Sequence, residues 1–337
     1  MASLADISRR AGTSVATASR VLNGSTHPVS EATRARVLQA AADLGYAPSA
    51  LAQALVTRSS RIIGVIVNDI VDPYFAEIAR GVEDVAGRMG HLVMVCNADH
   101  RPEAEIEYVR ALRDYHADGL VFAGSGAPSA TAANAELATQ VEAARARGAR
   151  VVALARRDFP AVHVGVDNAA AAYDVTDYLI SLGHRRIAFV QGPAELYTSG
   201  ERLAGFADAM AAAGLADDLR FDGGFDFEAG VAAGRRLLAC RPLPEAVFAA
   251  NDEAAIGVLT AFRHADVDVP GQVSVAGIDD TRPARFVELT TVNLPLYDLG
   301  AVAARHILAG PGEPQDDVVL AHRLVPRRST ARRASVS

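Results

Sequence analysis

The sequence predicts an α/β protein with a small helical head, and three observations indicate this fold class. Two short helical segments, 4–11 and 14–23, are joined by Gly12 and Thr13, which is the layout of a helix-turn-helix. From residue 61 onward, apolar runs of strand length alternate with helical segments, a pattern typical of parallel, doubly wound sheets. Because this alternation starts again after residues 162–166, we expect two Rossmann-like subdomains in succession.

Composition and charge exclude several classes of protein. The 337 residues are half apolar, but no apolar run reaches the roughly 18 residues that span a bilayer. The N-terminus lacks the layout of a secretion signal, so we expect a cytoplasmic protein with no membrane partner. The two cysteines lie far apart and predict neither a disulfide nor a metal site, and we expect no cofactor.

The charge is distributed unevenly along the chain. The formal net charge is −7, yet residues 1–60 carry six arginines and three acidic side chains, which leaves −10 for the rest. A small basic head on an acidic body favours contact with nucleic acid at one end of the chain.

The head is predicted to contain three helices. Ser3 and Asp6 have the spacing of a capping box at the start of the first helix. Ser30 can cap a third helix over residues 31–44, which ends at Gly45. Residues 49–55 allow only about two further turns, which are marginal in isolation, and a polar linker follows at 57–60.

The body is predicted to alternate strands and helices in order. Strands are expected at 62–67, 92–96, 119–123, 151–154, 162–166, 186–190, 246–250 and 273–277. Helices are expected at 74–89, 104–115, 169–182 and 202–213, between 123 and 151, and from 252. The Arg- and Ser-rich end of the chain, from residue 327, is typical of a disordered tail.

Motifs along most of the chain resemble those of the LacI/GalR family of transcriptional repressors. The match extends over residues 3–328, and the order and spacing of the motifs make it specific. They are Ala11-Gly12-Thr13-Ser14, Ser19-Arg20-Val21-Leu22-Asn23, Leu44-Gly45-Tyr46-Ala47-Pro48, Asp72-Pro73-Tyr74-Phe75, Val166-Asp167-Asn168, Gly183-His184-Arg185-Arg186-Ile187, Arg202-Leu203-Ala204-Gly205-Phe206, Ala250-Asn251-Asp252 and Gly277-Ile278-Asp279-Asp280.

The resemblance implies a domain plan. A DNA-binding head covers residues 1–48, a hinge helix and linker 49–60, a body similar to periplasmic sugar-binding proteins 61–328, and a disordered tail 329–337. Within the body, an N-subdomain takes about 61–160 and 293–320, and a C-subdomain about 161–292 and 321–328. A homodimer is expected, which would bind a palindromic operator in double-stranded DNA.

The resemblance also implies a DNA site. The second head helix would enter the major groove, where Arg20 can bind guanine in a bidentate manner and Val15 and Ala16 offer apolar contacts. Short polar groups suited to phosphate contacts are Ser14, Thr17, Ser19 and Asn23. Leu55 would wedge into the minor groove and kink the duplex. The alternatives are a solvated helix face and a leucine that packs between domains.

A small-molecule effector is expected in the cleft between the subdomains. The family positions that line it are Asp72, Phe75, Ser125, Thr198, Arg202, Phe225, Asn251 and Asp279. Carboxylate, amide and guanidinium groups with flat aromatic faces suit a sugar or sugar derivative. An interdomain ion pair between Arg202 and Asp279 is the alternative. Leu196 stands where purine-binding members carry arginine, which disfavours a purine, and Ala155 replaces an aspartate common in sugar-responsive members.

The alternatives are an enzyme, a stand-alone sugar-binding protein and a corepressor-dependent regulator. An enzyme is disfavoured because the sequence lacks phosphate-binding glycine motifs, a nucleophile elbow and metal-spaced His or Cys pairs. A stand-alone sugar-binding protein would need an export signal and no basic head. A regulator that binds DNA more tightly with its effector, by corepression, remains an alternative to release by induction.

Overall fold

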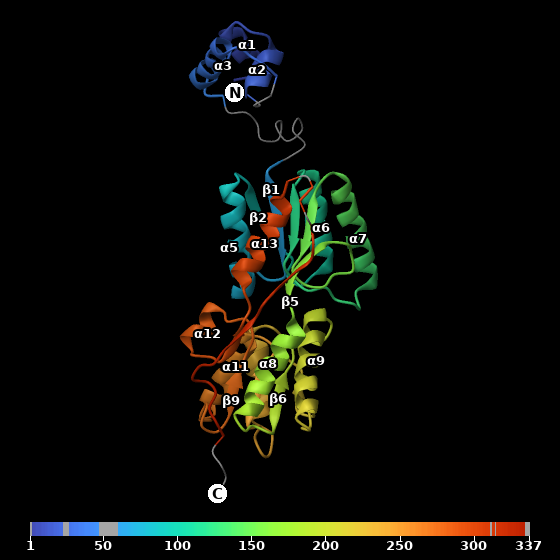
Figure 1. Ribbon diagram of the computed structural model, residues 1–337, viewed down its shortest axis with the longest axis vertical. Coiled ribbons are helices and arrows are strands. Elements are labelled where there is room, and N and C mark those ends of the chain that lie inside the picture. Colours follow the sequence, from blue (N-terminus) through green and yellow to red (C-terminus); the bar gives the residue numbers. More distant parts are fainter. Residues whose placement is uncertain (1, 23–26, 47–59, 311, 314, 334–337) are drawn as a thin grey trace. The chain divides into compact units, whose positions relative to one another are not determined.

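The computed structural model describes residues 2–22, 27–46, 60–310, 312–313 and 315–333. These residues form two compact units (Figure 1). The first extends to residue 61 and includes residues 115–117, and the second contains the rest of the chain. The predicted hinge segment lies almost wholly outside the described residues.

The first unit contains three short helices, α1 (Leu4–Ala11), α2 (Val15–Leu22) and α3 (Glu31–Asp43). The capping box at α1 is confirmed, since Ser3 Oγ accepts from the Asp6 amide and the Asp6 carboxylate accepts from the Ser3 amide. Gly12 ends α1 with a φ of 62°, a left-handed conformation that glycine adopts without strain. Ser30 caps α3 as predicted.

A small apolar core holds these helices together. Its buried members come from one face of each helix and are Ile7, Ala11, Ala18, Val21, Val37, Ala40 and Ala41. Arg10 and Asp43 join α1 to α3 at 2.8 Å, and Arg36 Nε donates to the Ala11 carbonyl at 3.2 Å. Of the α2 residues only Ala18 and Val21 are buried in this core, so the opposite face of α2 does not contribute to it.

The second unit begins with a six-stranded, all-parallel sheet. Its order is β11 (Val318–Leu320), β5 (Val162–Val166), β4 (Arg150–Ala153), β3 (Gly119–Phe122), β1 (Ile62–Val67) and β2 (Leu92–Asn97). Helices α5 (Pro73–Arg88) and α13 (Leu296–Leu308) pack together, and α6 (Pro102–Asp114) and α7 (Thr131–Ala146) form a second pair (Figure 1). The fully apolar β1 and β3 are buried, as strands between two helical layers must be.

A second parallel sheet has the order β7 (Arg220–Phe221), β6 (Ile187–Val190), β8 (Ala246–Ala249) and β9 (Ser274–Ala276). Helices α8 (Asn168–Ser181) and α9 (Tyr197–Ala212) pair, as do α10 (Phe227–Leu237) and α11 (Asp252–His264), while the short α12 (Arg282–Phe286) contacts α11. The doubly wound halves are therefore confirmed. The expected division after residue 160 is wrong, because β5 pairs with β4 and β11 in the first sheet.

The chain passes between the halves three times. It leaves the first half after β5, returns through β10 (Thr291–Asn293) to α13, and leaves again after β11 through β12 (Arg323–Val325). Strands β10 and β12 form an antiparallel pair at this crossing.

The tail from residue 329 was predicted to be disordered, and for residues 329–333 that prediction is wrong. Ser329 and Thr330 are buried. The Val275 amide donates to the Ser329 carbonyl at 2.8 Å, and Ser329 Oγ donates back to the Val275 carbonyl at 2.6 Å. The polar composition that suggests disorder instead supplies hydrogen bonds to the edge strand β9. Residues 334–337 lie outside the described part of the chain.

No described helix is both long and apolar enough to cross a bilayer.

Candidate functional site

The outer face of α2 carries the predicted base-reading residues. Ala18 and Val21 point into the head core, whereas Val15, Ala16 and Arg20 are exposed, with Val15 keeping 49% of its surface accessible. Arg20 forms no ion pair with another described residue. Its guanidinium is therefore available to an external acceptor.

The short polar residues of this segment have structural contacts as well. Ser14 Oγ accepts from the Thr17 amide at 3.1 Å and lies 2.9 Å from Thr17 Oγ1, so Ser14 caps α2. Ser14 is exposed, and Thr17 and Ser19 are half-buried. Two further predicted DNA residues, Asn23 and Leu55, lie outside the described residues.

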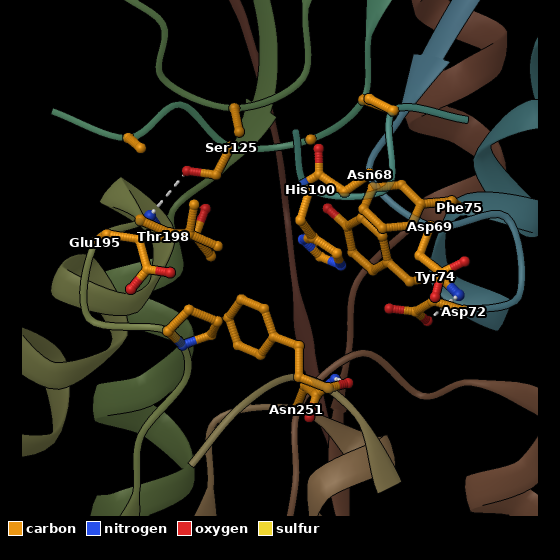
Figure 2. A pocket seen from close by; sticks show the side chains of 18 of the residues that line it. Asn68, Asp69, Asp72, Tyr74, Phe75, His100, Ser125, Glu195, Thr198 and Asn251 are labelled. Carbon is orange, nitrogen blue, oxygen red and sulfur yellow. Dashed lines mark hydrogen bonds between the residues drawn. The ribbon is translucent and has the colours of Figure 1, made fainter. Parts of the chain in front are cut away.

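The second unit contains a cavity of about 700 Å³ lined by both of its halves. This volume is within the range of ligand sites in proteins, roughly 300–1,000 Å³. All eight predicted effector residues line it: Asp72, Phe75, Ser125, Thr198, Arg202, Phe225, Asn251 and Asp279. Figure 2 shows Asp72, Tyr74 and Phe75 on one wall, Glu195 and Thr198 on the opposite one, and Asn251 below them. Most of these positions are brought together because they follow the carboxyl end of a strand or begin a helix, and Arg202 reaches the cavity from the second turn of α9.

Arg202 is the centre of a buried hydrogen-bond network. It is 3% exposed, on the first turns of α9, and each of its three nitrogens has a partner. Nε donates to Asn168 Oδ1 at 3.1 Å, one terminal nitrogen donates to the Ala250 carbonyl, and the other lies 3.2 Å from Asp279 Oδ1. Arg202 and Asp279 thus form an ion pair, but within the second half and not between the halves.

Asp279 is held in an unusual backbone conformation. Its φ is 125°, a backbone conformation that residues other than glycine rarely adopt. Holding a residue in this conformation costs about 1–3 kcal/mol. Asp252 supports this loop, since it accepts from the Thr281 amide at 2.8 Å and from Thr291 Oγ1 at 2.6 Å. Burial raises the pKa of Asp279, and the adjacent Arg202 partly opposes this effect. The Asp279 carboxylate accepts from Arg202 and also from the backbone amide of Asp252.

Asp72 lies on the opposite wall, where it caps α5. Its Oδ1 accepts from the Tyr74 amide at 2.8 Å. Burial, together with repulsion from Asp279, raises the pKa of Asp72 to about 7. Tyr74 and Phe75, which follow Asp72 in the sequence, line the cavity next to it. Their rings meet edge to face with centroids 5.0 Å apart.

Ser125 and Thr198 contact each other across the cavity. Ser125 Oγ accepts from the Thr198 amide at 3.2 Å (Figure 2). It also donates to the Gly126 carbonyl at 3.2 Å. The Tyr197 amide also donates to the Gly126 carbonyl, at 3.1 Å. These bonds join the two halves at one side of the cavity, a role that the sequence did not predict for either residue.

Sequence reasoning missed Asn68 and a buried ion pair. Asn68 lines the cavity and is 8% exposed, and its side-chain amide has no hydrogen bond to another described residue. Arg157 pairs with both oxygens of Glu105 at 2.8 Å and donates to the Gly124 carbonyl at 2.9 Å. The position of Asn68 directly after β1 is a signal that could have identified it, because ligands of such sheets bind beyond the strand ends.

Both parts of the chain match known families. The pattern of the bacterial regulatory proteins of the lacI family matches residues 3–49, and that of the periplasmic binding protein-like domain matches residues 176–330. The HTH-type transcriptional regulator RegA of Clostridium saccharobutylicum is 33% identical over 338 residues, covering 97% of this chain and 99% of RegA.

Solved structures agree. The lac repressor dimer bound to operator and the anti-inducer ONPF is 25% identical, with a TM-score of 0.83 over 98% of this chain and 99% of that one. The transcriptional regulator CelR in complex with cellobiose is 30% identical, with a TM-score of 0.70 over 98% of this chain and all of that one. The chain therefore belongs to the LacI family of bacterial regulatory proteins.

Proposed function

We propose that this protein is a homodimeric, non-enzymatic repressor that leaves a palindromic DNA operator when a small sugar-like molecule occupies the cavity of its second unit. The observation that carries this proposal is the combination, in one chain, of an exposed recognition face on α2 and a cavity between two α/β halves that is lined by charged, polar and aromatic side chains. The lac repressor dimer bound to operator and CelR bound to cellobiose support it as relatives of the same fold.

On the DNA side, each head would read one half of the operator. Arg20 would bind guanine, Val15 and Ala16 would contact neighbouring bases, and Ser14, Thr17, Ser19 and Asn23 would contact phosphates. We assign residues 49–60 to the hinge of the DNA-binding head, with Leu55 as its minor-groove wedge.

On the effector side, the eight cavity residues would hold the ligand and draw the halves together. Asp279 and Asp72 would accept hydroxyl bonds, Asn251 and Arg202 would fix orientation, and Phe75 would cover an apolar face. Closure would shift the paired bodies and unfold the hinge. By linkage, effector and operator must then weaken each other's binding by the same factor.

Selection of duplexes from a random library, followed by titration of the selected operator, tests this function. We expect a palindromic site, and release of DNA by at least one sugar. Tighter DNA binding with the sugar would instead establish corepression. Failure to select any sequence would contradict the proposal.

Arg20→Ala should relax base preference at one position of each half-site, at a cost of about 1–3 kcal/mol on the preferred base. The measurement is affinity for operators that vary at each position. Arg9→Ala is the matched control, because Arg9 is an exposed arginine on α1 that pairs with Asp6 within its own helix. A uniform loss on all sequences would make Arg20 a phosphate contact.

Effector binding should strengthen as pH rises through 7. Burial raises the pKa of Asp72 to about 7, and repulsion from Asp279, Glu253 and Asp69 adds to this effect. A ligand hydroxyl that donates to Asp72 favours the ionised carboxylate, so it lowers this pKa and binding releases a proton. Calorimetry from pH 6 to 8 should show proton release on binding, and Asp72→Asn should remove the share of Asp72 while that of Asp279, whose pKa burial also raises, remains. Proton uptake on binding would contradict this assignment.

A further inference from the structure

The charge of the cavity restricts the class of ligand, an inference that rests on the proposed function. Of the described residues that line the cavity, eight are acidic and three are arginines. A neutral sugar requires no such excess of carboxylates, and an anionic ligand would be repelled by it.

Two of the three arginines are already neutralised. Arg157 is bound by both oxygens of Glu105 and by a backbone carbonyl, and its side chain is 5% exposed. Arg202 is bound by Asp279, Asn168 and the Ala250 carbonyl. The third, Arg101, is exposed at the surface. A phosphate group therefore meets no buried cation that is free to bind it.

The remaining carboxylates face the cavity from both halves. Asp72 comes from the start of α5 and Glu253 from the first turn of α11, and Asp279, the ion-pair partner of Arg202, also lines the cavity. Glu253 has no hydrogen-bonding or ion-pair partner among the described residues. Burial raises the pKa of Asp72, and repulsion from Asp279 and, less strongly, from Glu253 adds to this effect. A cation between them would remove this repulsion.

The uncharged lining suits the same ligand. Tyr74, Phe75 and Phe227 line the cavity beside the carboxylates, and aromatic faces attract ammonium groups. Asn68, more than nine-tenths buried and without a described partner, supplies an unused amide for a hydroxyl group (Figure 2). Asn251 is also buried, but its Oδ1 accepts from the Ala254 amide at 3.0 Å and its Nδ2 donates to the Phe225 carbonyl at 2.7 Å, so it keeps one N–H for a hydroxyl group.

We propose that the ligand is an amino sugar, whose ammonium group lies among Asp72, Glu253 and Asp279 while its hydroxyl groups bind Asn68 and Asn251. Loss of the positive charge, or its replacement by a phosphate, should weaken binding even where the ring is unchanged.

The experiment compares D-glucosamine, D-galactosamine and D-mannosamine with their N-acetyl forms, their parent hexoses and glucose 6-phosphate. Thermal shift and calorimetry are measured on the full chain at pH 7 and fixed ionic strength. We expect at least one hexosamine to bind about tenfold or more tightly than its N-acetyl and parent forms, a difference typical of a charged hydrogen bond. Glucose 6-phosphate should give no stabilisation. Binding of a neutral or phosphorylated sugar as tightly as every hexosamine, or no binding of any hexosamine, overturns the proposal.

Substitutions of single acidic residues test where the ammonium group of the ligand binds. Glu253→Gln should weaken the hexosamine about tenfold and change a parent hexose by less than about threefold. Glu107→Gln, on the exposed outer side of α6, is the matched control and should change neither. An unchanged preference in Glu253→Gln contradicts the placement of the ammonium group. Operator release by a neutral hexose would leave the proposed function standing while this inference fails.

Discussion

Arg202→Ala is expected to destabilise the protein by about 3–5 kcal/mol, the usual cost of removing one partner of a buried ion pair. The change leaves the Asp279 carboxylate 3% exposed without its cation and leaves Asn168 and the Ala250 carbonyl without their donor. Urea denaturation monitored by circular dichroism measures the free energy of unfolding.

Two further variants make this expectation specific. Arg202→Ala with Asp279→Asn should recover part of the loss, because the uncompensated charge is removed as well. Arg220→Ala breaks an exposed pair with Asp217 in the same half and should cost at most about 1 kcal/mol. Equal losses for Arg202→Ala and Arg220→Ala would show that the buried network does not stabilise the second half.

Alanine substitutions at two glycines of α9 should change the free energy of unfolding in opposite directions. A Cβ at Gly205 would lie 2.0 Å from the Ala169 carbonyl oxygen on α8, so the helices must separate, at a cost of about 3 kcal/mol. A Cβ at Gly200 meets no atom within 4 Å, so Gly200→Ala should stabilise the helix by up to about 1 kcal/mol.

The comparison controls for helix propensity, because both positions are interior to the same helix. Thermal melts and urea titrations of the two variants measure the difference. Because Ala169 follows Asn168, we also expect Gly205→Ala to disturb the hydrogen bond that Arg202 donates to Asn168 and to weaken effector binding. Stabilisation by both substitutions would mean that α8 and α9 can separate without loss.

Local sequence signals predicted most of the fold. Apolar runs of strand length, bounded by turn residues, located β1, β3, β6 and β8, and serine spacing located the caps of α1 and α3. The two-residue β7 and the five-residue α12 were not predicted, because they are too short to show a period. Ser329 and Thr330 were misinterpreted because their order comes from a strand about fifty residues away in sequence.

The residues that line the candidate cavity were predicted from the family resemblance. The hydrogen bonds and ion pairs among them were not predicted. The eight residues indeed line one cavity, but the sequence could not show that Ser125 is hydrogen-bonded to the Thr198 amide. Nor could it reveal the pair of Glu105 and Arg157, which are separated by 52 residues and meet only when the sheet has formed. Such partners are set by tertiary packing, and no local period encodes them.

Because the chain crosses between the halves three times, the first half cannot finish folding until most of the chain has been synthesised. The first half cannot complete its sheet at Val166, because its last strand begins at Val318. At a synthesis rate of about 10 residues per second, the missing strand emerges on the order of 15 seconds later. During that interval the second half can fold, while the neighbouring edge of β5 has no partner and is open to wrong pairing. The three-helix head is exposed to the cell first, so a nascent chain can present a recognition helix before its effector cavity exists.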